Sequence, residues 1–429
     1  MYDLTVIGSG WAGFNAALRA KESGLKVCLI EREKIGGTCL NVGCIPTKTL
    51  LQSAKVYSLA RKSPVFGLEP LAPQINLEKV QERKEDIIRQ LASGMQFMLK
   101  GIDVIKENAK LLSTQEIQTG SQKIQTKFIL IATGSSSIEL PFLKFDNKKI
   151  ISSDTLLSLK KVPATLLIIG GGVIGCEFAS LFSILGSQVT IVEKMPQLLP
   201  GEDKEVARKL ETIFKKKGIK INTNTDASSV NTNDFELVLV SVGRSPRTEG
   251  LDLDKLGIKT DKGRVVVDEN LCTNIPNIFA AGDCTGMKML AHFAAYQGCI
   301  SANNIIHPNL LKKVDDGAVP NCIFTDPEIA SVGMNEEQAR AKNIDMQVKK
   351  FDFLGSGMAR ILDETDGFIK IISDKKSDEV LGASIIGPKA TELIAILTLA
   401  VSNHLKASCL SNTIFAHPTL SESIHEAIK

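Results

Sequence analysis

The chain has 429 residues, more than a single hydrophobic core normally supports, so we expect two or more domains. With 43% hydrophobic and 23% charged residues it has the composition of an ordinary globular protein, and a formal net charge of +3 is too small to favour nucleic acid or an anionic membrane as a partner. No apolar run approaches the roughly 18 residues of a membrane span, and the first residues lack the features of an export signal. We therefore expect a cytoplasmic protein.

Two segments of the N-terminal half resemble each other. Each has an apolar run typical of a strand, the pattern G-x-G-x-x-G, a stretch typical of a helix, and a second apolar run that closes on a glutamate 23 residues after the first glycine. One such glycine pattern alone is weak, but a strand before it, a helix after it and an acid at this distance predict a dinucleotide-binding fold. The positions are Gly8, Gly10, Gly13 and Glu31 in the first copy, and Gly170, Gly172, Gly175 and Glu193 in the second.

Each position of this pattern has a physical role. The first glycine permits a tight turn, the second lets the backbone approach a pyrophosphate, and the third lets helix and strand pack closely, with the phosphates at the positive end of the helix. The acid accepts a hydrogen bond from a ribose hydroxyl and repels a 2′-phosphate, so Glu193 favours NAD over NADP. Trp11 is bulky for the variable part of such a turn, unless its side chain points away.

Other apolar runs complete the predicted fold. The runs at 128–136, 237–246 and 277–284 each lead to a glycine and suit buried parallel strands. Apolar residues recur at helical spacing between Leu77 and Met98, which predicts a helix whose stripe packs on the core. From Gly317 onward, alternating strands precede a helix at 391–405, which indicates a separate α+β domain.

Cys39 and Cys44 stand five positions apart in the segment GGTCLNVGC. A regular helix would hold them too far apart for a disulfide, whose Cα atoms lie about 4.4–6.8 Å from each other, but a bend at Gly43 would bring them together. Pro46 is typical of the first turn of a helix, so Cys44 is expected at a helix N-terminus, where the dipole lowers the pKa of a thiol. The pattern favours a redox-active pair.

Two other interpretations of this pair are weaker. A structural zinc site normally needs four ligands in paired clusters, and no second cysteine or histidine cluster stands elsewhere in the chain, so we expect no metal. An inert pair would not need the flanking glycines.

The chain has nine cysteines, an odd number with irregular spacing, which does not suit a secreted disulfide framework. Three of them stand in apolar runs, and we expect these to be inert packing residues: Cys28, Cys176 and Cys322.

In its motifs the chain resembles the pyridine nucleotide-disulfide oxidoreductases, and among them most closely the dihydrolipoamide dehydrogenases. GGTCLNVGCIPTKTLL is similar to the redox-disulfide motif, GGGVIGCEFAS to the nicotinamide-binding turn, AAGDC to a flavin contact and AHPTLSE to the C-terminal base motif. The resemblance implies an α/β chain with two Rossmann-like domains, which bind FAD and NAD, and a C-terminal α+β dimerisation domain. The implied domains are residues 1–145 with 264–316 for FAD, 146–263 for NAD, and 317–429 for dimerisation.

The resemblance also implies roles for individual residues. Cys39 resembles the interchange thiol that meets the substrate, and Cys44 the thiol that lies against the flavin. Lys48 and Glu177 are similar to a pair near the reactive nitrogen of the flavin, although Lys48 alone would be interpreted as a solvated lysine. The further cofactor-binding residues are Gly37, Thr38, Lys48, Thr133, Gly134, Asp283, Leu290, Ala291 and Gly243.

His417 and Glu422 belong to the base motif. Without the resemblance, Thr419 and Glu422 would be interpreted as a capping box at a helix start, with His417 in the preceding loop. Oxidation of a dithiol requires a base, because the thiolate is the attacking species, and a histidine oriented by a carboxylate supplies one. The resemblance implies that His417 serves Cys39 of the partner subunit across a two-fold interface, in an obligate homodimer.

The implied function is the FAD-dependent oxidation of protein-bound dihydrolipoamide to lipoamide, with reduction of NAD. The implied partner is a lipoyl-bearing protein of a 2-oxo acid dehydrogenase or glycine cleavage complex. Three alternatives stay open. A glutathione reductase usually prefers NADP and differs after the histidine-proline pair, a mercuric reductase often has a vicinal cysteine pair where this chain has SIHEAIK, and a non-catalytic flavin-binding scaffold would not require the cysteines or His417.

One departure concerns the second dinucleotide fold. Relatives usually have a small antiparallel meander after the acid-bearing strand, whereas here only residues 218–236 fill this interval. We therefore expect a shortened NAD-binding domain and weaker binding of NAD.

Overall fold

The structure, a computed structural model, describes residues 1–429 and divides into two compact units. The first unit comprises Met1–Leu50, Glu78–Ile138 and Gly243–Asp315, and the second comprises Leu51–Leu77, Glu139–Val242 and Asp316–Lys429. The first unit contains a mainly parallel sheet and the second a fully parallel sheet, both flanked by helices. The second unit also contains an antiparallel sheet. This architecture confirms the predicted α/β fold class. The boundaries of the three implied domains stay a prediction.

The first unit is built on a seven-stranded sheet in the order β3-β2-β1-β6-β5-β4, with β16 paired to β6. Parallel pairing joins β1, β2, β3, β6 and β16, whereas β4 and β5 extend the sheet in antiparallel fashion. The sheet strands are β1 Tyr2–Ile7, β2 Val27–Ile30, β3 Asp103–Ile105, β4 Lys110–Leu111, β5 Glu116–Gln118, β6 Lys123–Ile131 and β16 Ile278–Ala280. Short pairs outside the sheet are β7 Ser135–Ser137 with β13 Arg244–Pro246, and β14 Thr260–Asp261 with β15 Arg264–Val265.

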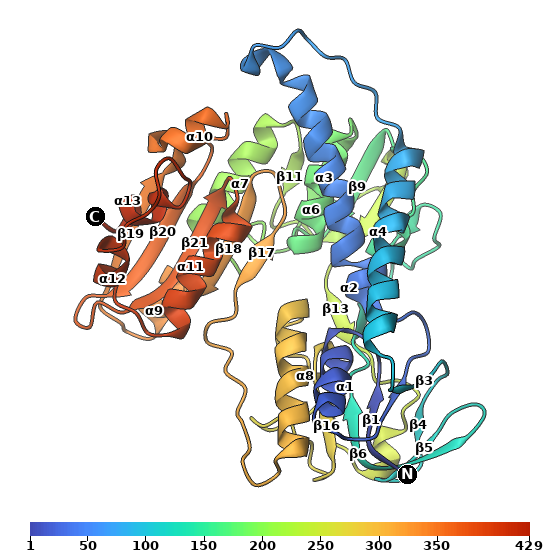
Figure 1. Ribbon diagram of the computed structural model, residues 1–429. Coiled ribbons are helices and arrows are strands. Elements are labelled where there is room, and N and C mark those ends of the chain that lie inside the picture. Colours follow the sequence, from blue (N-terminus) through green and yellow to red (C-terminus); the bar gives the residue numbers. More distant parts are fainter. The chain divides into compact units, whose positions relative to one another are not determined.

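Two helices, α1 and α8, pack against each other in this unit and lie side by side in Figure 1. A Cβ on Gly298 of α8 would come within 2.1 Å of the Ala12 carbonyl oxygen of α1, so only glycine permits this approach. The helices and turns of the first unit are α1 Trp11–Glu22, α2 Gly37–Val42, η4 Leu253–Leu256, η5 Asp283–Thr285 and α8 Ala291–Ile306, with α4 Leu77–Met98 beginning at its boundary. Helix α3 Cys44–Arg61 begins in the first unit and continues into the second.

The second unit repeats the glycine-turn architecture on a five-stranded parallel sheet in the order β11-β10-β9-β12-β8. Its strands are β8 Ile150–Ile151, β9 Thr165–Ile169, β10 Gln188–Val192, β11 Lys220–Asn222 and β12 Leu237–Val240, and its helices are α5 Ser153–Leu156, α6 Val173–Ile184 and α7 Lys204–Lys216. Between β11 and β12 there are only two short turns, η2 Ala227–Ser229 and η3 Thr232–Asp234, and no strand. The interval is therefore bridged without an antiparallel meander.

The C-terminal part of the second unit contains a five-stranded antiparallel sheet in the order β17-β18-β21-β20-β19. Helix α11 packs on it and contributes Leu393, Ile394 and Leu397 to a buried cluster, as the apolar pattern predicted. Its elements are β17 Asn321–Ile323, β18 Glu328–Gly333, α9 Glu336–Ala341, β19 Met346–Asp352, η6 Phe353–Gly355, α10 Gly357–Ile361, β20 Phe368–Asp374, β21 Val380–Gly387, α11 Ala390–Ser402, α12 Ala407–Ser411 and α13 Glu422–Ile428, and η1 Ser63–Phe66 precedes them in the same unit.

A buried ion cluster within the second unit joins strand β20 to the starts of helices α7 and α9. The Lys370 side chain on β20 is only 3% exposed, and its Nζ lies 2.9 Å from Asp203 Oδ2 and 2.7 Å from Glu336 Oε2. Because a buried ammonium ion is costly without partners, these carboxylates are what permits a lysine at this position. No helix of the structure is both long enough and apolar enough to cross a membrane.

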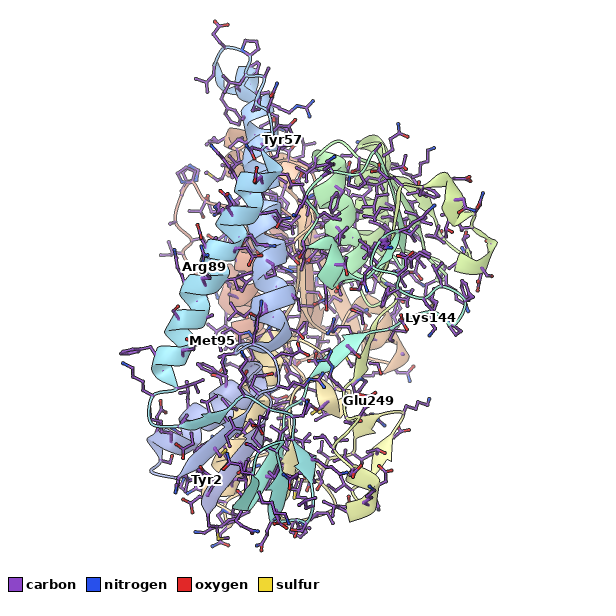
Figure 2. The ribbon with its side chains drawn as sticks, turned by 90° about the vertical axis from the view of Figure 1, so that its right-hand side faces the viewer. Tyr2, Tyr57, Arg89, Met95, Lys144 and Glu249 are labelled. Atoms are coloured by element: carbon purple, nitrogen blue, oxygen red, sulfur yellow. The ribbon has the colours of Figure 1, made fainter.

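Helix α4 confirms the predicted helix, but the predicted packing of its whole apolar stripe is wrong. Ile88 is buried, whereas Leu91 is 44% and Met98 51% exposed. Nothing in the single chain covers Leu91 and Met98, and neither of them lines the cavity that α4 borders through Ile88 and Ala92. Figure 2 shows Arg89 and Met95 on this helix.

The third glycine of the first turn provides a test of the fold. A Cβ on Gly13 would lie 1.9 Å from the Gly8 carbonyl oxygen, so Gly13→Ala should force backbone apart and lower the free energy of unfolding by about 1–3 kcal/mol or more. Gly94→Ala is the matched control, because Gly94 lies within α4 with open space around it, and alanine there should leave stability unchanged or raise it by up to about 1 kcal/mol. Urea unfolding of both variants measures the difference, and equal stabilities would contradict the close approach.

Candidate active site

Both glycine patterns form the turn that the sequence predicts, between β1 and α1 and between β9 and α6. Gly8 and Gly170 adopt φ angles of 103° and 104°, in the region that favours glycine. A Cβ on Gly175 would lie 2.0 Å from the Gly170 carbonyl oxygen, which repeats the contact between Gly13 and Gly8. The two turns are therefore alike in backbone geometry as well as in sequence.

The second glycines, Gly10 and Gly172, are the N-cap residues of α1 and α6. Neither helix start has a side-chain cap, and no atom lies within 4 Å of a Cβ built on either glycine. The space that a side chain would occupy at these two helix starts is therefore open. This arrangement suits a pyrophosphate, because helix N-termini attract negative charge.

The two acids, Glu31 and Glu193, hold their turns in the same way. Each carboxylate accepts one hydrogen bond from a backbone N–H of its glycine turn and another from the residue two positions after the acid. These carboxylates are therefore fixed at the ends of β2 and β10, where a ribose would lie. The N···O distances are 2.8 Å from Ser9 and 2.8 Å from Glu33 to Glu31, and 2.6 Å from Gly171 and 2.7 Å from Met195 to Glu193.

A cavity of about 620 Å³ lies beside Glu31 in the first unit. Its lining combines apolar residues such as Ile88 and Ile102 with the basic side chains of Lys34 and Arg89. This volume is typical of a small-molecule site. The cavity is therefore large enough for part of a dinucleotide at the end of β2.

Cys39 and Cys44 lie on opposite sides of a helix break. Cys39 belongs to α2, Gly43 ends that helix with φ −139° and ψ −114°, and Cys44 is the first residue of α3. A Cβ at Gly43 would come within 2.9 Å of the Thr38 carbonyl oxygen, so the bend requires glycine. The predicted break at Gly43 is confirmed, and Cys44 stands at a helix N-terminus.

The two thiols interact directly. A hydrogen bond with the Cys44 thiol, together with burial, raises the pKa of the Cys39 thiol well above its ordinary value. The indole of Trp11 and the backbone N–H of Cys44 act on the Cys39 sulfur in the opposite direction and lower its pKa. The pair is therefore coupled, and a thiolate on one sulfur is stabilised by the proton on the other.

The other cysteines differ from this pair. Cys28 and Cys176 are fully buried, and burial raises the pKa of the Cys28 thiol to about 12, as expected for inert packing residues. Cys322 on β17 is partly exposed but packs against the buried cluster of the C-terminal part, and its sulfur contacts the Thr391 carbonyl oxygen at 3.9 Å.

Asp283 begins the short turn η5 directly after β16. Its Oδ2 accepts a hydrogen bond of 2.5 Å from the Ser135 hydroxyl, and Arg244 donates to that same hydroxyl at 2.8 Å. The fully buried Gln297 of α8 fixes the turn from the other side, because its Oε1 accepts the Gly282 N–H at 2.8 Å. Asp283 is thus held directly by Ser135, which Arg244 orients, and its turn is held by Gln297.

Other residues that the sequence analysis proposes as cofactor-binding also lie in the first unit. The Thr133 hydroxyl donates to the Arg247 carbonyl oxygen, and the Gly134 carbonyl oxygen accepts the Arg247 N–H at 2.9 Å. Leu290 is the N-cap of α8, which begins at Ala291 and has no side-chain cap. Gly243 adopts φ 131°, and its carbonyl oxygen accepts the Ile138 N–H at 3.1 Å.

His417 and Glu422 form a hydrogen-bonded pair in the second unit. The His417 Nδ1 lies 2.9 Å from Glu422 Oε1, and the other carboxylate oxygen accepts the Thr419 N–H at 2.7 Å. The Thr419 N–H and then His417 lower the pKa of the Glu422 carboxyl, so it is ionised at neutral pH. Only half of the capping box is present, because α13 begins at Glu422 and the Thr419 hydroxyl donates to the Ala416 carbonyl oxygen instead.

Lys48 lies on the first part of α3 and Glu177 lies on α6. Glu177 is 3% exposed, and its Oε1 accepts the backbone N–H of Phe324 at 2.9 Å. This carboxylate therefore links the second glycine-turn fold to the start of the antiparallel sheet. The pairing of Lys48 with Glu177 stays a prediction.

Family models match the two parts of the chain in turn. Residues 2–298 match the pyridine nucleotide-disulphide oxidoreductase family, and residues 319–428 match the dimerisation domain of that family. The chain belongs to the pyridine nucleotide-disulphide oxidoreductases. It is an NAD-dependent flavoprotein disulfide oxidoreductase that uses FAD and NAD, and its C-terminal part is a dimerisation domain.

Curated relatives within this family are similar over almost their full length. A dihydrolipoyl dehydrogenase of Bacillus subtilis is 39% identical over 448 residues, which cover 99% of this chain and 97% of the relative. A dihydrolipoyl dehydrogenase of Chlamydia trachomatis is 39% identical over 442 residues, with 98% and 95% covered.

Solved structures of the same family have the same fold. LpdA from Mycobacterium tuberculosis is 29% identical with a TM-score of 0.92, and the match covers 99% of both chains. The HOCl-induced flavoprotein disulfide reductase RclA from Escherichia coli is 31% identical with a TM-score of 0.89, and the match covers 100% of this chain and 99% of RclA.

The first unit fits the FAD of this family. The open space at Gly10 suits the pyrophosphate, the cavity beside Glu31 suits the adenosine end, and the fixed Asp283 stands at the end of β16. Bound FAD supplies a two-electron carrier between thiols and NAD. The second unit offers the equivalent turn at Gly172 and the equivalent acid, Glu193, for NAD.

Several residues that build the site were missed by sequence reasoning. Ser135, Arg244 and Gln297 hold Asp283, and Ser9 holds Glu31 through its hydroxyl as well as its N–H. Ser9 stands inside the first glycine pattern, and Ser135 and Arg244 stand in the predicted strand runs 128–136 and 237–246. No pattern in the sequence linked Ser135, Arg244 or Gln297 to the Asp283 turn.

The two acids allow a crossed test of the dinucleotide assignments. Glu193→Gln should raise the KM for NAD about ten- to a hundredfold and reduce discrimination against NADP, because one charged hydrogen-bond acceptor is lost. Glu31→Gln should instead weaken retention of FAD. Steady-state kinetics and the flavin content of purified protein measure the two effects. Each variant is the control of the other, and loss of FAD from Glu193→Gln would contradict the assignment.

Proposed function

We propose that this enzyme is a dihydrolipoyl dehydrogenase, which oxidises protein-bound dihydrolipoamide to lipoamide with reduction of NAD. The observation that carries the proposal is the coupled Cys39 and Cys44 pair, held on a helix break in the same unit as the first dinucleotide turn. The near full-length similarity to dihydrolipoyl dehydrogenases supports this choice of substrate.

The thiol chemistry assigns different tasks to the two cysteines. A thiolate of dihydrolipoamide attacks Cys39, the bond between Cys39 and Cys44 breaks, and Cys44 leaves as a thiolate. The second lipoyl thiolate then attacks the lipoyl sulfur of the mixed disulfide and releases Cys39. The substrate loses two protons and two electrons, and the cysteine pair gains the two electrons.

Cys44 is suited to hold the negative charge after this exchange. It is the first residue of α3, so the positive end of the helix dipole lies at its sulfur. Lys48 follows one turn later on the same helix and adds a positive charge to this region. Together with Glu177 it is proposed to lie near the reactive nitrogen of bound FAD.

The base of the reaction is proposed to be His417 of the partner subunit, oriented by the partner's Glu422. Two observations support this role. The His417 side chain is 80% exposed in the isolated chain, and its Nδ1 is held by an ionised carboxylate, which leaves Nε2 free to take a proton. The dimerisation domain supplies the means to bring a second chain to the site. The enzyme is then an obligate homodimer.

The proposed partner is a lipoyl-bearing protein of a 2-oxo acid dehydrogenase or glycine cleavage complex. Dihydrolipoyl groups are carried on such proteins, so the enzyme must receive a tethered substrate instead of a freely diffusing one. Both cysteines are only partly exposed, which favours a substrate group that extends from its carrier protein.

A second candidate function is the reduction of a disulfide substrate by NADH, in the reverse direction. The similarity to the disulfide reductase RclA over the whole chain favours it. Turnover with dihydrolipoamide and NAD, compared with turnover of NADH with lipoamide and with oxidised glutathione, separates the candidates. If NADH reduced oxidised glutathione faster than lipoamide, the proposed function would be overturned.

The two cysteines provide the direct test. Cys39→Ser and Cys44→Ser should each lower the turnover of dihydrolipoamide with NAD by at least about a thousandfold, because the disulfide cannot form, while bound FAD is retained. Stopped-flow absorbance of NADH and the flavin spectrum measure both properties. Cys409→Ser is the control, because Cys409 is exposed on α12 and should be dispensable. Lipoamide turnover that survives in Cys44→Ser would refute the scheme.

The origin of the base can be tested by complementation. Homodimers of His417→Ala should lose about 10²–10⁴-fold in turnover, as expected for removal of a general base. Random assembly of His417→Ala with Cys39→Ser subunits should regain about a quarter of wild-type activity, because about half of the dimers are mixed and each mixed dimer holds one intact site out of two. If the base acted within its own subunit, mixing would restore nothing.

A further inference from the structure

The single tryptophan of the chain stands in the first glycine turn, as the first residue of α1. The ring packs edge-on against Phe14 with centroids 6.5 Å apart, and it lies against the buried cluster of the first unit. The Asn15 side chain donates a 2.8 Å hydrogen bond to the Trp11 carbonyl oxygen, which holds the backbone at this residue. The packing therefore restricts the orientation of the indole.

The Trp11 indole nitrogen is buried, and it makes no hydrogen bond of normal geometry. Buried N–H donors without a partner are rare, because their desolvation is not compensated. The donor lies close enough to the Cys39 sulfur to act on it as a weak donor. A neutral thiol or a disulfide sulfur is a poor acceptor, which explains why the donor is left without a conventional partner.

The backbone explains why this tryptophan and this cysteine meet. A Cβ on Gly37, the first residue of α2, would come within 2.7 Å of the Gly10 Cα, so the start of α2 lies directly on the glycine turn. The Gly36 N–H also donates to the Ser9 carbonyl oxygen at 3.2 Å. Trp11 follows Gly10, and Cys39 follows Gly37 by two residues, so both side chains are held near this contact.

We propose that Trp11 is a positioning residue of the redox centre, whose indole N–H is held in place to donate a hydrogen bond to the Cys39 thiolate. The bond forms when Cys39 leaves the mixed disulfide as a thiolate, and it weakens again when the disulfide reforms. No atom is transferred by Trp11. The proposal rests on the proposed role of Cys39 as the interchange thiol.

The physical advantage lies in the difference between the two states of the sulfur. A hydrogen bond to an ionised acceptor is about twice as strong as one to a neutral acceptor, so the donor favours the thiolate over the thiol or disulfide. Because the ring is already oriented, this preference costs no reorganisation when the charge appears. A leaving thiol with a lower pKa also departs faster in disulfide exchange. The Cys44 N–H acts on the same sulfur, so two fixed donors share the charge.

The test is the ionisation of Cys39 in the reduced holoenzyme. The rate of alkylation by iodoacetamide is followed against pH, with Cys39 identified by peptide mass spectrometry. Trp11→Phe keeps the ring and removes the N–H, and it should raise the apparent pKa of Cys39 by about one pH unit, so alkylation at neutral pH slows about tenfold. Phe14→Leu is the matched control, because it loosens the same contact but keeps the N–H, and its alkylation profile should match the wild type.

The alternative role of the donor is a hydrogen bond to bound dinucleotide. An unchanged alkylation profile in Trp11→Phe would overturn the proposal, whether or not FAD is lost.

If Trp11→Phe does not fold, the fluorescence of Trp11 in the wild type serves instead, because no other tryptophan contributes. Its emission intensity should fall as the pH is raised through the pKa of Cys39. This step should be missing in Cys39→Ser. An emission step of the same size in both proteins would also overturn the proposal. Neither measurement uses dihydrolipoamide, so the result is independent of the substrate.

Discussion

A contact between two stretches of backbone, at Gly10 and Gly37, determines the geometry of the redox centre. It holds the short helix α2 on the turn that suits a pyrophosphate, and α2 carries Cys39. Gly43 then bends the chain so that Cys44 begins the next helix within hydrogen-bonding reach of Cys39. Cofactor site and thiol pair are thus parts of one compact arrangement, which needs glycine wherever backbone meets backbone.

The two glycine turns share one design and differ in what surrounds them. In both, a fixed carboxylate at a strand end accepts N–H groups of the turn, and the helix start is left open. The first turn then receives the cysteine helix. Behind the second, Glu177 binds the backbone at the start of the antiparallel sheet, which belongs to the dimerisation domain. The two copies of the fold are therefore alike in the turn itself and differ in the element that packs beside it.

The sequence was informative wherever a short pattern fixes a local structure. The glycine spacing predicted both turns, and Gly43 predicted the break between the cysteines, because only local backbone geometry is involved. The sequence was silent on contacts between distant segments, such as the hold of Gln297 on the Asp283 turn, since no periodicity encodes them. It misled at Leu91, because helical spacing shows that an apolar stripe exists but not which of its residues another element covers.

The double engagement of Glu193 limits how the coenzyme preference of this enzyme could be re-engineered. A protein engineer who wanted an NADP-linked form would replace this acid with a small or basic residue to admit the extra phosphate. Here the same carboxylate also fastens the N–H groups of Gly171 and Met195, so its removal would leave two backbone donors without their acceptor. A successful redesign must therefore supply a new acceptor for the loop along with the new charge.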